Sequence, residues 1–120
     1  MITTYKSRDI ETKNGISIRT TRSEDFVFKV LPLLGQIEDM MHDINEGEGK
    51  YPDVEACGAI GDTLDDLAAT TEQPSHHLVY AAAQFAYLLP HLLTFGCANK
   101  ESIRIVLEHL YDELLNAISS

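Results

Sequence analysis

The chain has 120 residues, 44% of them hydrophobic, so it can form one domain with its own core without a metal or disulfide. Its formal net charge is −10, and the acidic excess lies in residues 23–75, with thirteen acidic and two basic side chains. This distribution argues against direct nucleic-acid binding, which needs Lys and Arg to neutralise phosphates.

The first residues, MITTYKSRDIETK, lack the apolar segment of a secretory signal. Cys57 and Cys97 form neither a CxxC nor a zinc-binding pattern. We therefore expect a cytoplasmic protein with free thiols and no membrane segment.

Residues 1–22 are predicted to form a β-hairpin arm. The dipeptide Asn14-Gly15 separates two alternating segments and favours a two-residue type I′ turn, because both central residues of that turn need positive φ. The next apolar run, FVFKV at residues 26–30, has two interpretations. It is either the start of a helix with Ser23 as N-cap, or a third strand followed by a helix that begins at Pro32.

The rest of the chain predicts four amphipathic helices, at about residues 23–46, 52–70, 74–95 and 99–118. Short links between helices favour an antiparallel bundle. We therefore expect a mainly α fold: a single-domain four-helix bundle over residues 23–120, preceded by the hairpin. Asn99 is the expected N-cap of the fourth helix.

The third helix is unusual because residues 78–97 contain no Asp, Glu, Lys or Arg. Helical spacing divides it into a predicted core stripe and an opposite row. The stripe consists of Leu78, Ala81, Ala82, Phe85, Leu88, Leu89 and Leu92, and the row of Tyr80, Gln84, Tyr87 and His91. Three interpretations compete: a helix covered by its own domain, a subunit or partner interface formed by the row, and a membrane span. The row also suits the wall of a small-ligand pocket.

Two pairs of side chains with helical spacing are candidates for a metal site. Asp39-x-x-His42 and Asp62-x-x-Asp65 resemble, in spacing only, the acidic pairs of all-α nucleotide pyrophosphohydrolases. The resemblance implies a magnesium-dependent nucleotide hydrolase as an alternative function. Helical geometry opposes it, because Asp39 and Asp62 fall opposite the apolar stripes, whereas a metal site in a bundle core needs inward carboxylates.

The sequence therefore favours a small, acidic, non-enzymatic binding or regulatory protein, with no predicted catalytic residue, metal or cofactor. We expect a homodimer or a protein partner that uses the row Tyr80, Gln84, Tyr87 and His91. A basic partner could also dock on an outward acidic surface formed by Asp39, Asp43, Glu46, Asp62 and Asp66. One form of this hypothesis is an inhibitor that imitates a nucleic-acid backbone.

Overall fold

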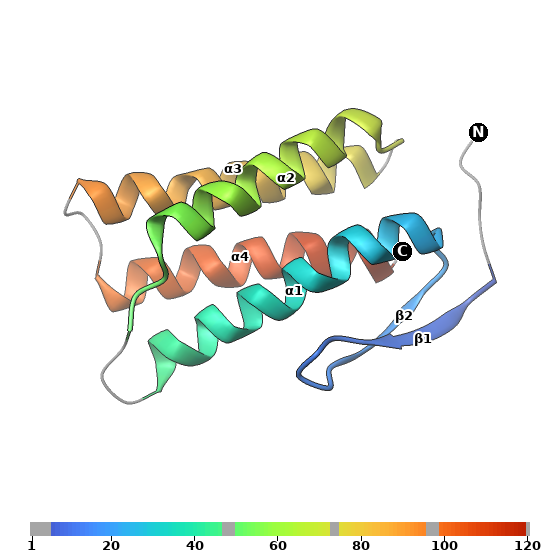
Figure 1. Cartoon of the computed structure of the whole chain (residues 1–120), viewed down its shortest axis with the longest axis horizontal. Helices are drawn as coiled ribbons and strands as arrows, with labels where there is room; N and C mark the ends of the chain where they lie inside the picture. The colour runs from blue at the N-terminus through green and yellow to red at the C-terminus, as the bar shows by residue number, and fades with distance from the viewer. Residues whose placement is uncertain (1–5, 47–49, 73–74, 96–98, 120) are drawn as a thin grey trace.

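The computed structural model describes residues 6–46, 50–72, 75–95 and 99–119. A two-stranded antiparallel hairpin, β1 (Arg8–Glu11) and β2 (Ser17–Thr20), precedes four helices (Figure 1). These helices are α1 (Glu24–Asn45), α2 (Val54–Thr70), α3 (Ser75–Thr94) and α4 (Lys100–Ser119). The predicted fold class is confirmed, and each helix boundary lies within two residues of its prediction. Gly96 and Cys97 lie outside the described residues.

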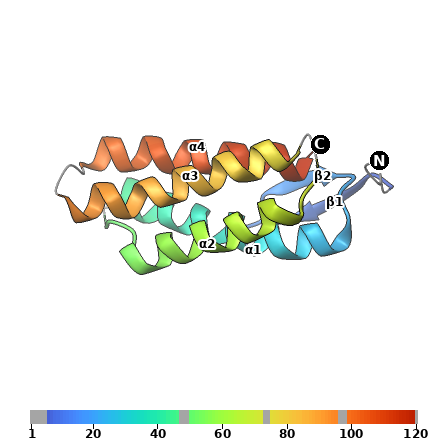
Figure 2. The same cartoon turned by 90° about the horizontal axis from the view of Figure 1, so that it is seen from above.

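Successive helices run in opposite directions, with α2 packed against α3, α3 against α4, and α4 against α1 (Figures 1 and 2). Each helix contributes an apolar stripe to one core. Its largest fully buried side chains include Leu34, Ile37, Ile60, Leu64, Leu89, Leu107, Leu110 and Leu114. α3 is therefore flanked by two neighbours, α2 and α4, and keeps one side away from the bundle.

The first helix begins at the earlier of its two predicted starts. The Ser23 hydroxyl accepts a hydrogen bond of 3.1 Å from the Phe26 amide, and acidic residues occupy the first turn, where the helix dipole favours them. α1 then continues through Pro32, with Phe26, Val27 and Val30 buried. The third-strand interpretation of residues 26–30 is wrong, because the capped, amphipathic helix buries these side chains in the bundle.

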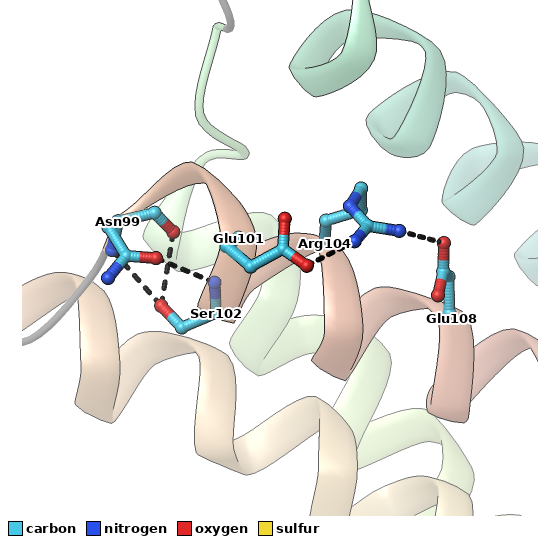
Figure 3. Close-up of polar contacts among 5 residues, drawn as sticks. All are labelled: Asn99, Glu101, Ser102, Arg104 and Glu108. Atoms are coloured by element: carbon cyan, nitrogen blue, oxygen red, sulfur yellow. Dashed lines mark hydrogen bonds and ion pairs between the residues drawn. The ribbon is translucent and has the colours of Figure 1, made fainter.

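The predicted cap of the fourth helix is confirmed. Asn99 Oδ1 accepts a hydrogen bond of 2.8 Å from the Ser102 amide, and Ser102 Oγ accepts one of 3.0 Å from the Asn99 amide (Figure 3). One turn further on, Arg104 pairs with both Glu101 and Glu108. These ion pairs lie on the helix surface, where solvent screens them, so they add little to the stability of α4.

The hairpin turn differs from the predicted type I′ turn. The Gly15 amide donates to the Thr12 carbonyl at 2.9 Å, and Gly15 alone has positive φ, +86°. This is a three-residue loop, a type I turn followed by a glycine bulge, and it pairs Ile10 with Ile18. A two-residue turn would have shifted the register by one residue and placed these isoleucines on opposite faces. The longer loop puts both on the same face of the hairpin, where Ile18 is buried and Ile10 is partly buried.

The hairpin is held on the bundle by the Glu38 carboxylate of α1. Its Oε1 accepts hydrogen bonds from Thr12 Oγ1 at 2.8 Å and Asn14 Nδ2 at 2.9 Å, and its Oε2 accepts one from Tyr111 Oη at 2.5 Å. Burial and the bond to Glu38 raise the pKa of Tyr111. Since Thr12 is only 4% exposed, its hydroxyl depends on this acceptor. Glu38 thus joins the hairpin, α1 and α4.

We predict that Glu38→Ala lowers the free energy of unfolding by about 3 kcal/mol, because the buried Thr12 hydroxyl and the partly buried Tyr111 hydroxyl lose a charged acceptor. Urea denaturation measures this loss, and amide hydrogen exchange at Ile10 and Ile18 should accelerate. Asp43→Ala is the matched control, because it removes an exposed carboxylate from the same helix and should change stability by less than about 0.5 kcal/mol. Equal effects of the two variants would contradict the docking role of Glu38.

Candidate functional site: the outward face of α3

The core face of α3 is built from small side chains. Its buried residues are Ser75, Val79, Ala82, Ala83, Ala86 and Leu89. The predicted core stripe is wrong in part, because Leu88 is 40% exposed and Leu78, Phe85 and Leu92 are only partly buried at the flanks. The reason is that α3 fits between two helices, and a face of alanines lets both approach closely.

The predicted row divides into one inward-leaning and three outward residues. Tyr87 leans onto α2, where its hydroxyl donates a hydrogen bond of 2.7 Å to Asp62 Oδ1. This bond and nearby carboxylates raise the pKa of Tyr87 to about 12. Tyr80, Gln84 and His91 are exposed instead. Tyr87 therefore has a partner within the chain, whereas the other three form part of the surface.

We define the outward face of α3 as His77, Tyr80, Gln84, Leu88 and His91. These residues are spaced by three, four, four and three positions, so they form one stripe along the helix. Tyr80 is 50% exposed and Leu88 40% exposed. Residues 75–95 contain no Asp, Glu, Lys or Arg, so about six turns of exposed helix carry no formal charge.

The other helices have charged outer faces. Exposed side chains on them include Asp25 and Lys29 of α1, Asp65 and Asp66 of α2, and Glu108 of α4. Phe85 on the flank of α3 stacks on His109 of α4, with ring centroids 5.4 Å apart. The stripe is thus an uncharged strip in a bundle whose other three helices carry charged residues on their outer faces.

The predicted acidic surface is divided between two places. Asp39 lies beneath the hairpin turn, where it pairs with Lys13 and accepts a hydrogen bond of 3.1 Å from Asn14 Nδ2. These two donors lower the pKa of Asp39. Asp62 lies against Tyr87 on α2. Asp43, Glu46 and Asp66 are exposed. Two of the five predicted acids, Asp39 and Asp62, therefore bind other side chains of the same chain. Sequence spacing gave no sign of either contact.

Asp39 and His42 lie beside the hairpin turn, whereas Asp62 lies against α3, so the two spacing pairs do not form one centre. Within the described ranges, three or more His, Cys, Asp or Glu side chains never group as metal ligands would. No helix there is long and apolar enough to cross a membrane. Cys57 is a free, buried thiol as predicted, and burial followed by the charge of Asp53 raises its pKa to about 11.

Comparison of the chain with protein-family models, with curated proteins and with solved structures gives no significant match. The functional argument therefore depends on the geometry of the site alone.

Two glycines of α2 differ in the space beside them, and only Gly61 contacts the Tyr87 ring. A Cβ at Gly61 would lie 2.7 Å from the Tyr87 ring, whereas a Cβ at Gly58 would meet nothing within 4 Å. We predict that Gly58→Ala stabilises the protein by about 0.5–1 kcal/mol through helix propensity. Gly61→Ala should destabilise it by about 1 kcal/mol, because the ring is displaced. Thermal unfolding compares the two variants. Equal stabilisation by both would show that Tyr87 does not depend on Gly61.

Proposed function

We propose that this chain is a small acidic binding protein that acts through protein–protein contacts, with the outward face of α3 as its contact surface. The single observation that carries the proposal is an exposed helix face of about six turns without a charged side chain. Tyrosine and leucine on such a face offer apolar area, and the tyrosine hydroxyl adds a polar group. Aromatic residues are enriched at protein interfaces for this reason.

The occupant that we propose for this face is a second copy of the chain. A partner that brought charged side chains onto the stripe would bury them without counter-charges, which is costly. The stripe of a second copy brings no formal charge. Two antiparallel α3 helices related by a twofold axis would place the same residues on both sides of the contact. The acidic outer faces of α1 and α2 would then remain available on both protomers.

Salt dependence distinguishes this occupant from a basic partner. Each chain has a net charge of −10, so two copies repel one another and salt screens that repulsion. A homodimer built on uncharged faces should therefore persist or strengthen as salt rises. A complex with a basic partner on the acidic residues should weaken instead.

We predict a dimer by light scattering at both low and high salt, and a monomer after Tyr80→Glu or Leu88→Glu. These substitutions place like charges opposite one another in the contact, but they leave the core untouched because both side chains are exposed. The variants should keep the thermal unfolding temperature of the original monomer, measured at low protein concentration.

Phe28→Glu is the matched control. Phe28 is 79% exposed on α1, a helix that packs against α4. Phe28→Glu also replaces an exposed apolar side chain by a carboxylate, but on α1 and not on α3. It should therefore leave the dimer intact. A monomeric original chain, or dissociation by Phe28→Glu alone, would overturn the proposal.

A further inference from the structure

The outward face of α3 has a spacing that is the same when it is followed from either end of the helix. Successive residues are three, four, four and three positions apart, and the middle one is Gln84. The face is about 21 Å long, at a rise of about 1.5 Å per residue. Two such helices that lie antiparallel about a twofold axis at Gln84 therefore place each residue of one face opposite a residue of the other.

This register brings unlike residues together everywhere except on the axis. Gln84 meets Gln84 of the second copy there, and each side-chain amide both donates and accepts hydrogen bonds. Tyr80 meets Leu88 of the second copy on each side of the axis, and both side chains are exposed in the single chain. At each end of the contact, His77 lies opposite His91 of the second copy.

Contacts within the chain explain why these two histidines lie on the outward face. His76 Nδ1 donates a hydrogen bond of 2.7 Å to the Ala68 carbonyl, so His76 turns toward α2. The neighbouring ring of His77, with its centroid 5.6 Å from that of His76, is left exposed. At the other end of α3, the exposed His91 ring packs on Phe95, with centroids 4.7 Å apart.

From this register we infer that the contact between two copies is pH-sensitive: it forms while His77 and His91 are neutral and dissociates when they gain protons. The inference rests on the proposed homodimer and adds its register and its regulation. Two neutral imidazoles share a hydrogen bond, because each has one N–H donor and one acceptor nitrogen. Two imidazolium rings have only donors and repel one another, so each end of the contact accommodates one proton more easily than two.

The titratable groups on the elements around α3 are mostly carboxylates. On α2 they are Asp62, Asp65 and Asp66, whose charges act on Tyr87, with Glu55 two turns earlier and Glu72 beyond the end of the helix. On α4 they are His109, which stacks on Phe85, and Glu113 one turn further on. These carboxylates favour protonated histidines in the single chain. Residues 75–95 contain no Asp or Glu, so α3 of the second copy offers no carboxylate to either histidine.

The overall charge of the chain acts in the opposite direction. Protonation of all five histidines would halve the net charge of −10, and two copies would then repel one another less. Salt screens this diffuse repulsion over about 8 Å at physiological ionic strength. Histidine rings that meet across the contact are closer than that and are partly removed from water, so their charges are screened much less. We therefore expect the local repulsion to dominate.

The direction of the pH effect follows from proton binding. A histidine side chain in water has a pKa of about 6.5. Below that pH the separated chains bind more protons than the dimer, so acid favours the separated chains. One pH unit lower, each proton that the contact excludes changes the association constant about tenfold. Exclusion of one proton at each end would therefore weaken the dimer up to about a hundredfold.

The test is sedimentation equilibrium at about pH 8 and about pH 5.5, at physiological ionic strength. We expect the dissociation constant of the dimer to rise between about tenfold and a hundredfold at the lower pH. Circular dichroism at both pH values verifies that the separated chains remain helical. The double variant His77→Gln/His91→Gln should keep the dimer at the higher pH and change its dissociation constant less than about twofold on acidification.

His42→Gln is the matched control for the loss of a histidine. His42 is an exposed histidine of α1 beside the hairpin turn, so its substitution should leave the full acid response.

Engineered cysteines test the register directly in a Cys57→Ala/Cys97→Ala background. Gln84→Cys should form a disulfide between two copies on mild oxidation, because residue 84 meets itself on the axis. Leu88→Cys should not, because the two copies of residue 88 would be about 12 Å apart along the helices. Gel electrophoresis without reductant measures the disulfide-linked dimer.

The outcomes separate this inference from the proposed function. A dimer whose dissociation constant is unaffected by pH, or tightens in acid, would overturn the inference and leave the homodimer in place. An acid response that persists in the double histidine variant, or disulfides at Leu88→Cys and not at Gln84→Cys, would do the same. A monomer at both pH values would overturn the homodimer itself.

Discussion

The position of the hairpin depends on one carboxylate. Glu38 accepts hydrogen bonds from the hairpin residues Thr12 and Asn14 and from Tyr111 of α4. A two-stranded hairpin is marginal alone, and here it is stabilised by a charged acceptor shared with two helices. Gly35 assists, because the absence of a Cβ lets the Lys13 side chain lie across α1, only 3.0 Å from where that Cβ would be. Within the described residues, these contacts tie the arm to α1 and α4.

The same bundle leaves two surfaces of different character. α3 meets its two neighbours through alanines, so its larger apolar and aromatic residues lie at the flanks or face outward. The hairpin presents charged side chains along a backbone edge. The first surface lacks formal charge, whereas the second mixes basic and acidic side chains.

Much of the architecture could be read from the residues. Helix starts were found through local side chains, because Ser23 and Asn99 make their capping bonds within three residues. The uncharged character of α3 was also evident. The contacts of Asp39 and Asp62 were missed, since their partners Lys13 and Tyr87 lie on other elements. The predicted turn of the hairpin is wrong for a related reason, because packing of Ile18 and the partly buried Ile10 against the helices fixes the register.

The sequence by itself determined the number and order of the four helices, their ends apart from the start of α1, the presence of a hairpin and the absence of charge from α3. These features depend on interactions between residues close in the chain and on hydrophobic spacing. Only the tertiary structure decided which side of α3 is buried, where the hairpin docks and which acids are engaged. Those choices depend on how α2, α4 and the hairpin approach one another, and side-chain volume and hydrogen bonding between distant residues set that approach.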